Sequence, residues 1–358
     1  MEPQVLKQSL GIDVAKDSLS LCLGTLAQDL EKQFTAGSDV PNEAKGFQQI
    51  EKWLNKLCVD KDRLVVVMEA TGVYHEGAAL YLHQRGYAVS IMQSGRVKRY
   101  AQSLDQRSKT DALDSRMLAM LGCERKLPAW SPPDGTLRHL KALSRERAFL
   151  LKEKNVEGNR LHAAEASAYG NLREAKRQAK RLKLLEAQLG EVEAEMRELV
   201  GSDEALAKKM KCLESIPGVS FISAATVVGE TCGFNEITSA KQLASYAGYD
   251  VVLKESGNFR GKTKISKKGN SHIRSILHMP SMTAVRVNPT LRVFYQRLKP
   301  NKAKPLVALV AVQRKLLLLM YSLYKNNEYY NPDIEQKKQQ EPKPLLHRIA
   351  EPLLENAS

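Results

Sequence analysis

Residues 108–116 contain two carboxylates whose spacing suits metal-assisted chemistry. Asp111 and Asp114 are three positions apart, so on a helix both side chains lie on one face. Two like charges that close repel by roughly 3 kcal/mol at an effective dielectric constant of about 20, and a bound divalent cation would offset the repulsion. The alternative is an ordinary helix start, in which Ser108 and Asp111 form a capping box and both acids favour the positive end of the helix dipole.

Two further acids occur where a shared metal site would need them. Asp13 follows a short apolar run, and Glu69 follows the apolar run at residues 64–68, so each lies at the end of a predicted strand. An α/β sheet can bring strand ends and a helix start to one edge, and carboxylate oxygens are ligands that Mg²⁺ or Mn²⁺ prefers. Two such ions can hold the attacking and leaving oxygens of a phosphodiester. Taken singly, Asp13 can also be a turn residue and Glu69 a solvated strand end.

The elements that must position these acids alternate between strands and helices. Residues 9–24 predict a hairpin with Asp13 near the end of its first strand, and residues 64–68 predict a buried central strand. Apolar spacing predicts further elements, namely a strand near residues 33–35, helices over 43–57 and 73–85, and a strand over 87–92. This alternation predicts an α/β domain.

A second candidate for chemistry is Ser256, in the most basic segment of the chain, residues 254–274. Ser256 precedes Gly257 on a predicted loop, where surrounding cations would stabilise the charge that develops when a hydroxyl attacks a phosphodiester. The nearest histidines, His272 and His278, are not adjacent, and a Ser-Gly pair is more often only a turn. The cations of this segment that we expect to bind nucleic acid are Lys254, Arg260, Lys262, Lys264, Lys267, Lys268 and Arg274.

Two helical features lie between these candidate sites. Residues 137–200 lack proline and are densely charged, which predicts long helices; within them a seam with coiled-coil spacing is formed by Leu182, Leu185, Leu189, Val192, Met196 and Leu199. The seam could pair across a dimer or inside a helical hairpin. Residues 212–229 predict two helices joined by a Pro-Gly turn. This unit is similar to a helix-hairpin-helix, whose turn at Gly218 can offer amides to a phosphate; the alternative is a hairpin that only packs.

Composition narrows the class of partner. A net charge of +15 and a pI near 9.5 favour a polyanion such as DNA, RNA or an anionic membrane. The chain has no run of about 18 apolar residues and no signal-peptide pattern, so we expect no membrane span. Its five scattered cysteines lack CxxC spacing, which favours reduced cytoplasmic thiols over disulfides or a zinc site. The predicted regions are 1–124, 125–205, 206–325 and a polar tail at 326–358.

Several segments carry a family resemblance. Gly-Ile-Asp13-Val-Ala-Lys, Met-Glu69-Ala-Thr-Gly-Val-Tyr and Lys109-Thr-Asp111-Ala-Leu-Asp114-Ser-Arg resemble the RuvC-like N-terminal domain of DEDD-type insertion-sequence transposases. That family includes the Piv-like DNA invertases and the bridge-RNA-guided recombinases. Leu-Glu-Ser-Ile-Pro-Gly-Val and the segment around Ser256 resemble its C-terminal transposase domain.

The resemblance implies a fold, an activity and partners. The fold would be a RuvC-like (ribonuclease H-like) α/β domain, followed by long coiled-coil helices and a mainly helical transposase domain. Asp13, Glu69, Asp111 and Asp114 would be the DEDD tetrad around Mg²⁺ or Mn²⁺, Lys109 a nearby nucleic-acid contact, and Ser256 the nucleophile that forms a phosphoserine link to DNA. The partners would be donor and target DNA, a structured guide (bridge) RNA, and further copies in a homodimer that assembles into a homotetramer. We expect a cytoplasmic, nucleoid-associated protein.

Three other interpretations fit parts of the sequence. A metal-dependent junction resolvase would use the tetrad alone and leave Ser256 as a turn. Gly-Ile-Asp-Val-Ala-Lys also resembles the first phosphate loop of actin-like sugar kinases, but these need a second Asp-x-Gly loop, and the chain contains no Asp-x-Gly. A non-enzymatic nucleic-acid-binding protein would be compatible with the charge, and four acids dispersed in the fold would favour it.

Overall fold

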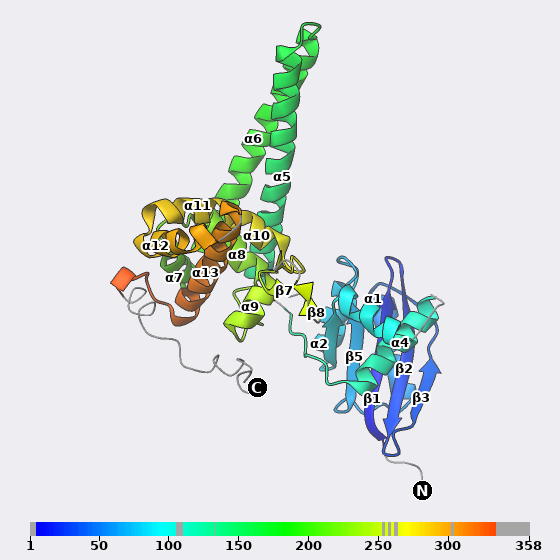
Figure 1. Cartoon of the computed structure of the whole chain (residues 1–358). Helices are drawn as coiled ribbons and strands as arrows, with labels where there is room; N and C mark the ends of the chain where they lie inside the picture. Colours follow the sequence, from blue (N-terminus) through cyan, green and yellow to red (C-terminus); the bar gives the residue numbers. More distant parts are fainter. Residues whose placement is uncertain are drawn as a thin grey trace, which may run out of the picture. The chain divides into compact units, whose positions relative to one another are not determined.

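The computed structural model describes residues 5–104, 110–132, 134–252, 255–256, 259–260, 264–301 and 304–333 (Figure 1). The chain forms two compact units, Met1–Pro132 and Pro133–Ser358. The first unit is a mixed α/β domain, and the second is mainly helical, as the sequence predicted.

The first unit is built on one mixed sheet with the strand order β3-β2-β1-β5-β6. Strands β1 (Val5–Val14), β2 (Ser18–Ala27) and β3 (Lys32–Ala36) form an antiparallel meander. Strands β5 (Leu64–Glu69) and β6 (Ala88–Met92) extend it on the other side of β1, both parallel to β1, and the short β4 (Val40–Pro41) pairs with β2. The strands predicted near residues 9–24, 33–35, 64–68 and 87–92 are therefore present.

Helices cover both faces of this sheet. Helices α1 (Ala44–Lys56) and α2 (Glu76–Gln84) pack on the face of Val66 and Met68, whereas α3 (Ser94–Ser103) and α4 (Asp111–Glu124) pack on the face of Val67. Because both faces are covered, β5 is a continuous apolar run rather than an alternating one. Asp13 and Glu69 lie at the ends of β1 and β5, where the sequence placed them.

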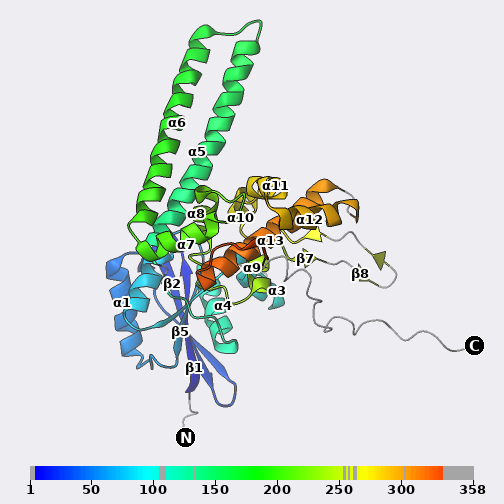
Figure 2. The same ribbon diagram turned by 90° about the vertical axis from the view of Figure 1, so that its left-hand side faces the viewer.

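The second unit begins with a long helical hairpin, α5 (Gly135–Ala166) and α6 (Leu172–Gly201), whose helices lie side by side in Figure 2. The helices that follow are α7 (Glu204–Glu214), α8 (Phe221–Glu230), α9 (Ala240–Tyr246), α10 (Ser271–Ile276), α11 (His278–Val287), α12 (Pro289–Leu298), the 3₁₀ turn η1 (Lys299–Asn301) and α13 (Pro305–Asn326). Short strand pairs join α9 to α10, namely β7 (Val251–Val252) with β10 (Lys264–Ile265), and β8 (Glu255–Ser256) with β9 (Phe259–Arg260).

Half of the seam of α6 is buried inside the hairpin, whereas Leu182, Leu185 and Leu199 are half-buried. Leu189, Val192 and Met196 belong to the same core cluster as Leu140 and Leu143 of α5. The internal hairpin, one of the two alternatives for this seam, is therefore what the chain forms. A coiled coil between chains is not required to bury these residues.

The turn between α7 and α8 is closed against another helix. Gly218 has a φ of +100°, and a Cβ at this position would lie 2.8 Å from the amide nitrogen of Ala284 in α11. Only glycine fits a left-handed turn with such a neighbour. The contact favours the hairpin that only packs over a turn that offers its amides to a phosphate.

Helix α13 is an apolar core helix. Within the described part of the chain, it alone is long and apolar enough to span a membrane, with a mean hydropathy of 1.7. Its residues Val312, Leu316 and Met320 are completely buried in the core of the second unit. The apolar composition of α13 is therefore explained by its packing against other helices of the second unit.

Candidate active site

Close packing of α4 on β1 positions the start of the helix. A Cβ at Gly11 would lie 2.0 Å from the carbonyl oxygen of Ser115, so no larger residue fits beneath α4 at this point. Towards the other end of the helix, a Cβ at Gly122 would lie 1.9 Å from Oγ of Ser9. Since Gly122 lies over Ser9 and Ser115 lies over Gly11, α4 runs antiparallel to β1. Its first turn therefore lies over the end of β1.

That first turn carries two of the four predicted acids. Asp111 is the first residue of α4 and is exposed, and Asp114 is partly buried. The N-cap is Thr110, whose Oγ1 accepts a hydrogen bond of 3.3 Å from the amide of Leu113. The capping box proposed with Ser108 was therefore wrong about the cap, because Thr110 is the residue with extended backbone just before the helix; Ser108 itself lies outside the described residues.

The other two acids are neighbours in the sheet. In the parallel pairing of β1 with β5, Gly11 faces Val67 and Ile12 faces Met68, so the next step of the register sets Asp13 beside Glu69. Alternate side chains share a face. Both acids therefore lie on the face of Val67, which is the face that α4 covers.

The acids affect one another electrostatically. The pKa of Asp13 is raised to about 6, first by burial and then by the negative charges of Asp114, Asp111 and Glu69. The structure thus brings all four predicted acids to one edge of the first unit. Dispersed acids, which would have favoured a binding protein without catalysis, are not what the fold contains.

Four oxygen-donor side chains are a suitable set for a hard divalent ion. Among the described residues, no three His, Cys, Asp or Glu side chains lie at metal-binding spacing, so the carboxylates would have to draw together around the ion. Their mutual repulsion opposes this in the free protein, and a divalent cation would remove that opposition. The residues present therefore fit a metal in charge and ligand type.

Ser256 lies in the second unit, on the short hairpin of β8 and β9. Its strand partner is Phe259, and Glu255 pairs with Arg260. Ser256 is exposed, so its hydroxyl is accessible to a large substrate. Three of the predicted nucleic-acid contacts, Lys109, Lys254 and Lys262, lie outside the described residues.

The base of the Ser256 loop is firmly held. Ser266 donates hydrogen bonds from its hydroxyl and its amide to Asp250, and the amide of Lys267 donates to Gly248 at 3.1 Å. Gly269 approaches α9 so closely that a Cβ would lie 2.4 Å from the carbonyl oxygen of Tyr246. The loop therefore leaves and re-enters the helical body through one packed junction.

The predicted cations of this segment divide into two groups. Lys264, Lys267 and Lys268 are exposed and available to a phosphate backbone. Arg274 instead donates hydrogen bonds to the carbonyl oxygens of Ala247 at 2.8 Å, Gly269 at 3.2 Å and Asn270 at 3.2 Å. Its observed role is to hold the junction of the loop.

A buried carboxylate, which no motif indicated, ties this junction to the hairpin. Glu230 at the end of α8 is 0% exposed and accepts two hydrogen bonds from Arg145 of α5, at 2.7 and 3.1 Å. It also accepts one from Asn270 at 2.7 Å, and Asn270 caps α10. Burial by itself would raise the pKa of Glu230, but the bonds from Arg145 and Asn270 outweigh it and lower the pKa.

Two family models match this chain. A DEDD transposase model of the IS110 type matches residues 10–165, and the model of the transposase IS116/IS110/IS902 family matches residues 210–296. The first range contains all four acids, and the second contains Ser256. The chain belongs to the DEDD insertion-sequence transposases. As a transposase, it acts on DNA.

Similar proteins extend over almost the whole length. The pilin gene-inverting protein of Moraxella lacunata is 26% identical over 339 residues, which cover 92% of this chain and 99% of that protein. The protein of the same name from Moraxella bovis is 25% identical over 339 residues, with the same coverage. An uncharacterized 42 kDa protein of insertion element IS900 from Mycobacterium paratuberculosis is 23% identical over 157 residues, 44% of this chain and 38% of that protein.

Solved structures with partial likeness include two of RuvC. The complex of Thermus thermophilus RuvC with a Holliday junction substrate has a TM-score of 0.24 at 12% identity, covering 32% of this chain and 90% of that one. A second Thermus thermophilus RuvC structure has a TM-score of 0.26 at 10% identity, covering 34% of this chain and 99% of that one. At TM-scores this low, neither likeness carries information about the fold of this chain.

Proposed function

We propose that this transposase cuts and rejoins DNA strands through a covalent link to Ser256, beside a Mg²⁺ or Mn²⁺ site in a ribonuclease H-like domain. The observation that carries the proposal is the set of four carboxylates at one edge of the first unit, with a raised Asp13 pKa. Isolated structural acids are normally paired or solvated, whereas a carboxyl whose pKa is raised by burial and by three neighbouring carboxylates, as for Asp13, is typical of a metal site.

In the proposed reaction, Oγ of Ser256 attacks a DNA phosphorus and loses its proton, while the bond from phosphorus to one sugar oxygen breaks. The sugar oxygen leaves as a hydroxyl after taking up a proton, and the phosphodiester energy is kept in the phosphoserine. A sugar hydroxyl of another strand then attacks the phosphoserine and releases Ser256. This second step rejoins the DNA. A bound divalent ion would stabilise the charge at phosphorus, and the exposed Lys264, Lys267 and Lys268 would hold the DNA backbone.

The carboxylates and Ser256 belong to different units. We therefore infer a composite site that assembles when nucleic acid binds, in a homodimer that forms a homotetramer on donor and target DNA. A structured guide RNA would select the DNA strands, and such an RNA should co-purify with a preparation that exchanges strands; an active preparation free of RNA would contradict this part. We infer that a protein with this activity on DNA works in the cytoplasm, at the nucleoid.

The covalent link can be trapped. Wild-type protein incubated with nicked suicide DNA, then denatured and digested, should carry a nucleotide adduct on Ser256 that mass spectrometry detects. Ser256→Ala should carry none while still binding DNA. Ser275→Ala, at an exposed serine on α10 of the same unit, is the matched control and should keep the adduct.

A second candidate is a resolvase-like nuclease that uses the carboxylates alone. It is favoured by the fact that all four acids lie within the first unit, which needs no residue of the second to bring them together. In that case Ser256→Ala would retain full cleavage, and no adduct would form. Loss of cleavage in Ser256→Ala together with a wild-type adduct excludes it.

A further inference from the structure

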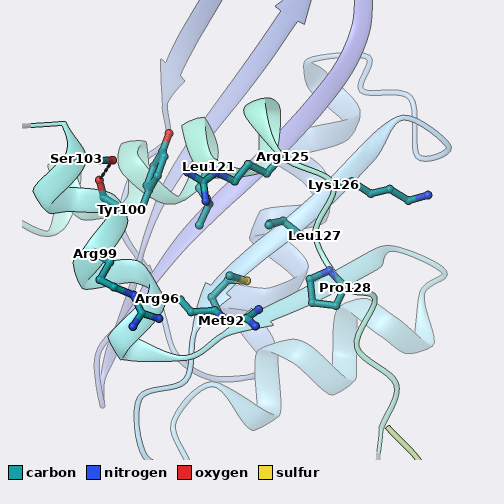
Figure 3. Close-up of a pocket in the computed structure, with 10 residues that line it drawn as sticks. All are labelled: Met92, Arg96, Arg99, Tyr100, Ser103, Leu121, Arg125, Lys126, Leu127 and Pro128. Atoms are coloured by element: carbon teal, nitrogen blue, oxygen red, sulfur yellow. Dashed lines mark hydrogen bonds between the residues drawn. The ribbon is translucent and has the colours of Figure 1, made fainter. Parts of the chain in front are cut away.

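The first unit contains a basic pocket that the proposed chemistry does not use. It has a volume of about 420 Å³ and lies between α3 and the chain that leaves α4 (Figure 3). Its cations come from two segments, Arg96 and Arg99 from α3, and Arg125 and Lys126 from the end of α4. Met92 and Leu127 contribute apolar surface to the same pocket.

Within the described residues, no carboxylate lines this pocket, and none of its four cations forms an ion pair. The nearest acid in sequence, Glu124, is already occupied, because one oxygen pairs with Lys32 and the other accepts a hydrogen bond of 2.8 Å from Tyr100. Cations gathered without a counter-ion are typical of an anion site.

The pocket is also partly preorganised. The guanidinium of Arg125 lies over the ring of Tyr100, 5.3 Å from its centre, as Figure 3 shows. Tyr100 is itself buried, and the bond from its hydroxyl to Glu124 fixes its ring. The carbonyl oxygen of Arg125 accepts a hydrogen bond of 2.7 Å from Lys7. Holding Arg125 in place before binding reduces the entropy that a ligand must offset.

The sheet register sets the pocket beside the carboxylates. Met92, at the end of β6, pairs with Glu69 at the end of β5. Glu69 in turn lies beside Asp13, and all three side chains are on the face covered by α3 and α4. The pocket and the carboxylates therefore lie along the same edge of the sheet. A nucleic-acid strand bound at the carboxylates and running along this edge would also reach the pocket.

We propose that this pocket binds a phosphodiester group of the nucleic-acid strand that the carboxylates act on. The inference rests on the proposed function, since it assigns the pocket to the substrate of that site. Arginine forks match phosphate geometry with two hydrogen bonds each, and a phosphodiester is the anion that the proposed DNA substrate presents along this edge. The apolar surface of Met92 and Leu127 leaves room for the attached sugar.

Arginine footprinting tests the pocket directly. Full-length Ser256→Ala protein is treated with phenylglyoxal, and modification is measured by mass spectrometry with DNA, with RNA of the same sequence, or with inorganic phosphate. DNA should protect Arg96, Arg99 and Arg125 more than RNA of the same sequence does, and stronger protection by RNA overturns the proposal, because the carboxylates are proposed to act on DNA. Arg85, which pairs with Glu51 at 2.9 Å and lies on the side of α2, should not change. Protection by inorganic phosphate alone, or none with oligonucleotide bound, overturns the proposal.

Binding measurements separate the pocket from general charge. Arg96→Gln with Arg99→Gln should weaken oligonucleotide binding about tenfold and lower the slope of log K against log salt by about 1. Lys52→Gln with Lys56→Gln removes the same charge from exposed positions on α1, on the opposite face, and should change little. Equal weakening by both pairs would overturn the proposal. Neither experiment needs DNA cleavage. The pocket proposal can therefore be overturned while the Ser256 adduct forms, and it can be supported when no adduct forms.

Discussion

Asp13 bears the charge repulsion that a metal would relieve. Its pKa is about 6 in the folded chain, against an ordinary value of 3.8, so ionising it costs more in the folded state than in the unfolded one. For an acid with a raised pKa, this cost is fully present above pH 6 and is absent below about 3.8. After allowance for solvent screening, it is about 1 kcal/mol.

Asp13→Asn should therefore stabilise the metal-free protein at pH 7.5. We expect calorimetry in EDTA to show a melting temperature about 2–5 °C higher than wild type, with the difference shrinking as the pH falls towards 4. Asp17→Asn, at an exposed position of the following turn, should have no such effect. Added Mg²⁺ should stabilise wild type but not Asp13→Asn. A lower melting temperature for Asp13→Asn in EDTA at pH 7.5 would contradict the prediction that charge on Asp13 destabilises the metal-free protein.

At the scale of elements, Glu230 couples the long hairpin to the Ser256 loop. Through Arg145 it contacts α5, and through Asn270 it contacts the start of α10, where the loop ends. Its folded pKa is lowered, so the stability that it contributes is present at neutral pH and is lost as the pH falls through that lowered value. A buried carboxylate is costly to the folded state unless its hydrogen-bonding partners remain in place.

Glu230→Gln should cost about 2 kcal/mol of stability, because it replaces the charged hydrogen bonds of a buried carboxylate with weaker neutral ones, while the half-exposed Arg145 can still be solvated. It should also speed hydrogen exchange at residues 264–273 and lower the yield of the Ser256 adduct, while DNA binding is kept. Glu193→Gln removes the Arg147 ion pair of the same hairpin, whose carboxylate is 34% exposed, and should cost less than about 1 kcal/mol. Unchanged exchange at residues 264–273 in Glu230→Gln would show that the junction does not depend on this carboxylate.

At the scale of the whole molecule, the hairpin keeps apolar side chains outside its own core. Phe149 is 59% exposed and Val156 is 41% exposed, and their spacing of seven residues sets them on one face of α5. Since Leu189, Val192 and Met196 of the α6 seam are already buried internally, we expect a dimer through the hairpin to use such outer residues.

Phe149→Glu with Val156→Glu should therefore convert the proposed dimer into monomers, as measured by light scattering, because two charges would be buried at the contact. Their effect on the melting temperature should be small, since both side chains are exposed. Leu189→Ala is the opposite control, and should lower stability by about 2–3 kcal/mol while leaving the mass unchanged. A wild-type dimer that persists in the double variant would place the interface elsewhere.

The sequence by itself determined the kinds of elements and the candidate acids, because those depend on local patterns. The apolar run before Glu69 predicts a buried strand, and the run before Asp13 predicts a strand end, whatever the rest of the chain does. The spacing of Asp111 and Asp114 likewise needs only a helix. Ser256 was indicated by charge and by the family resemblance, and its proposed role awaits the adduct experiment.

Tertiary structure decided which of these residues meet. Gly11 admits α4 onto β1 and so brings the charge of Asp114 close enough to act on Asp13, a proximity that depends on packing and not on any local pattern. Arg145 and Glu230 pair across 85 positions, and the buried residues of the α6 seam pack against α5, which lies beside α6. Such contacts join residues far apart in sequence, where neither spacing nor propensity carries information, and only the fold brings them within bonding distance.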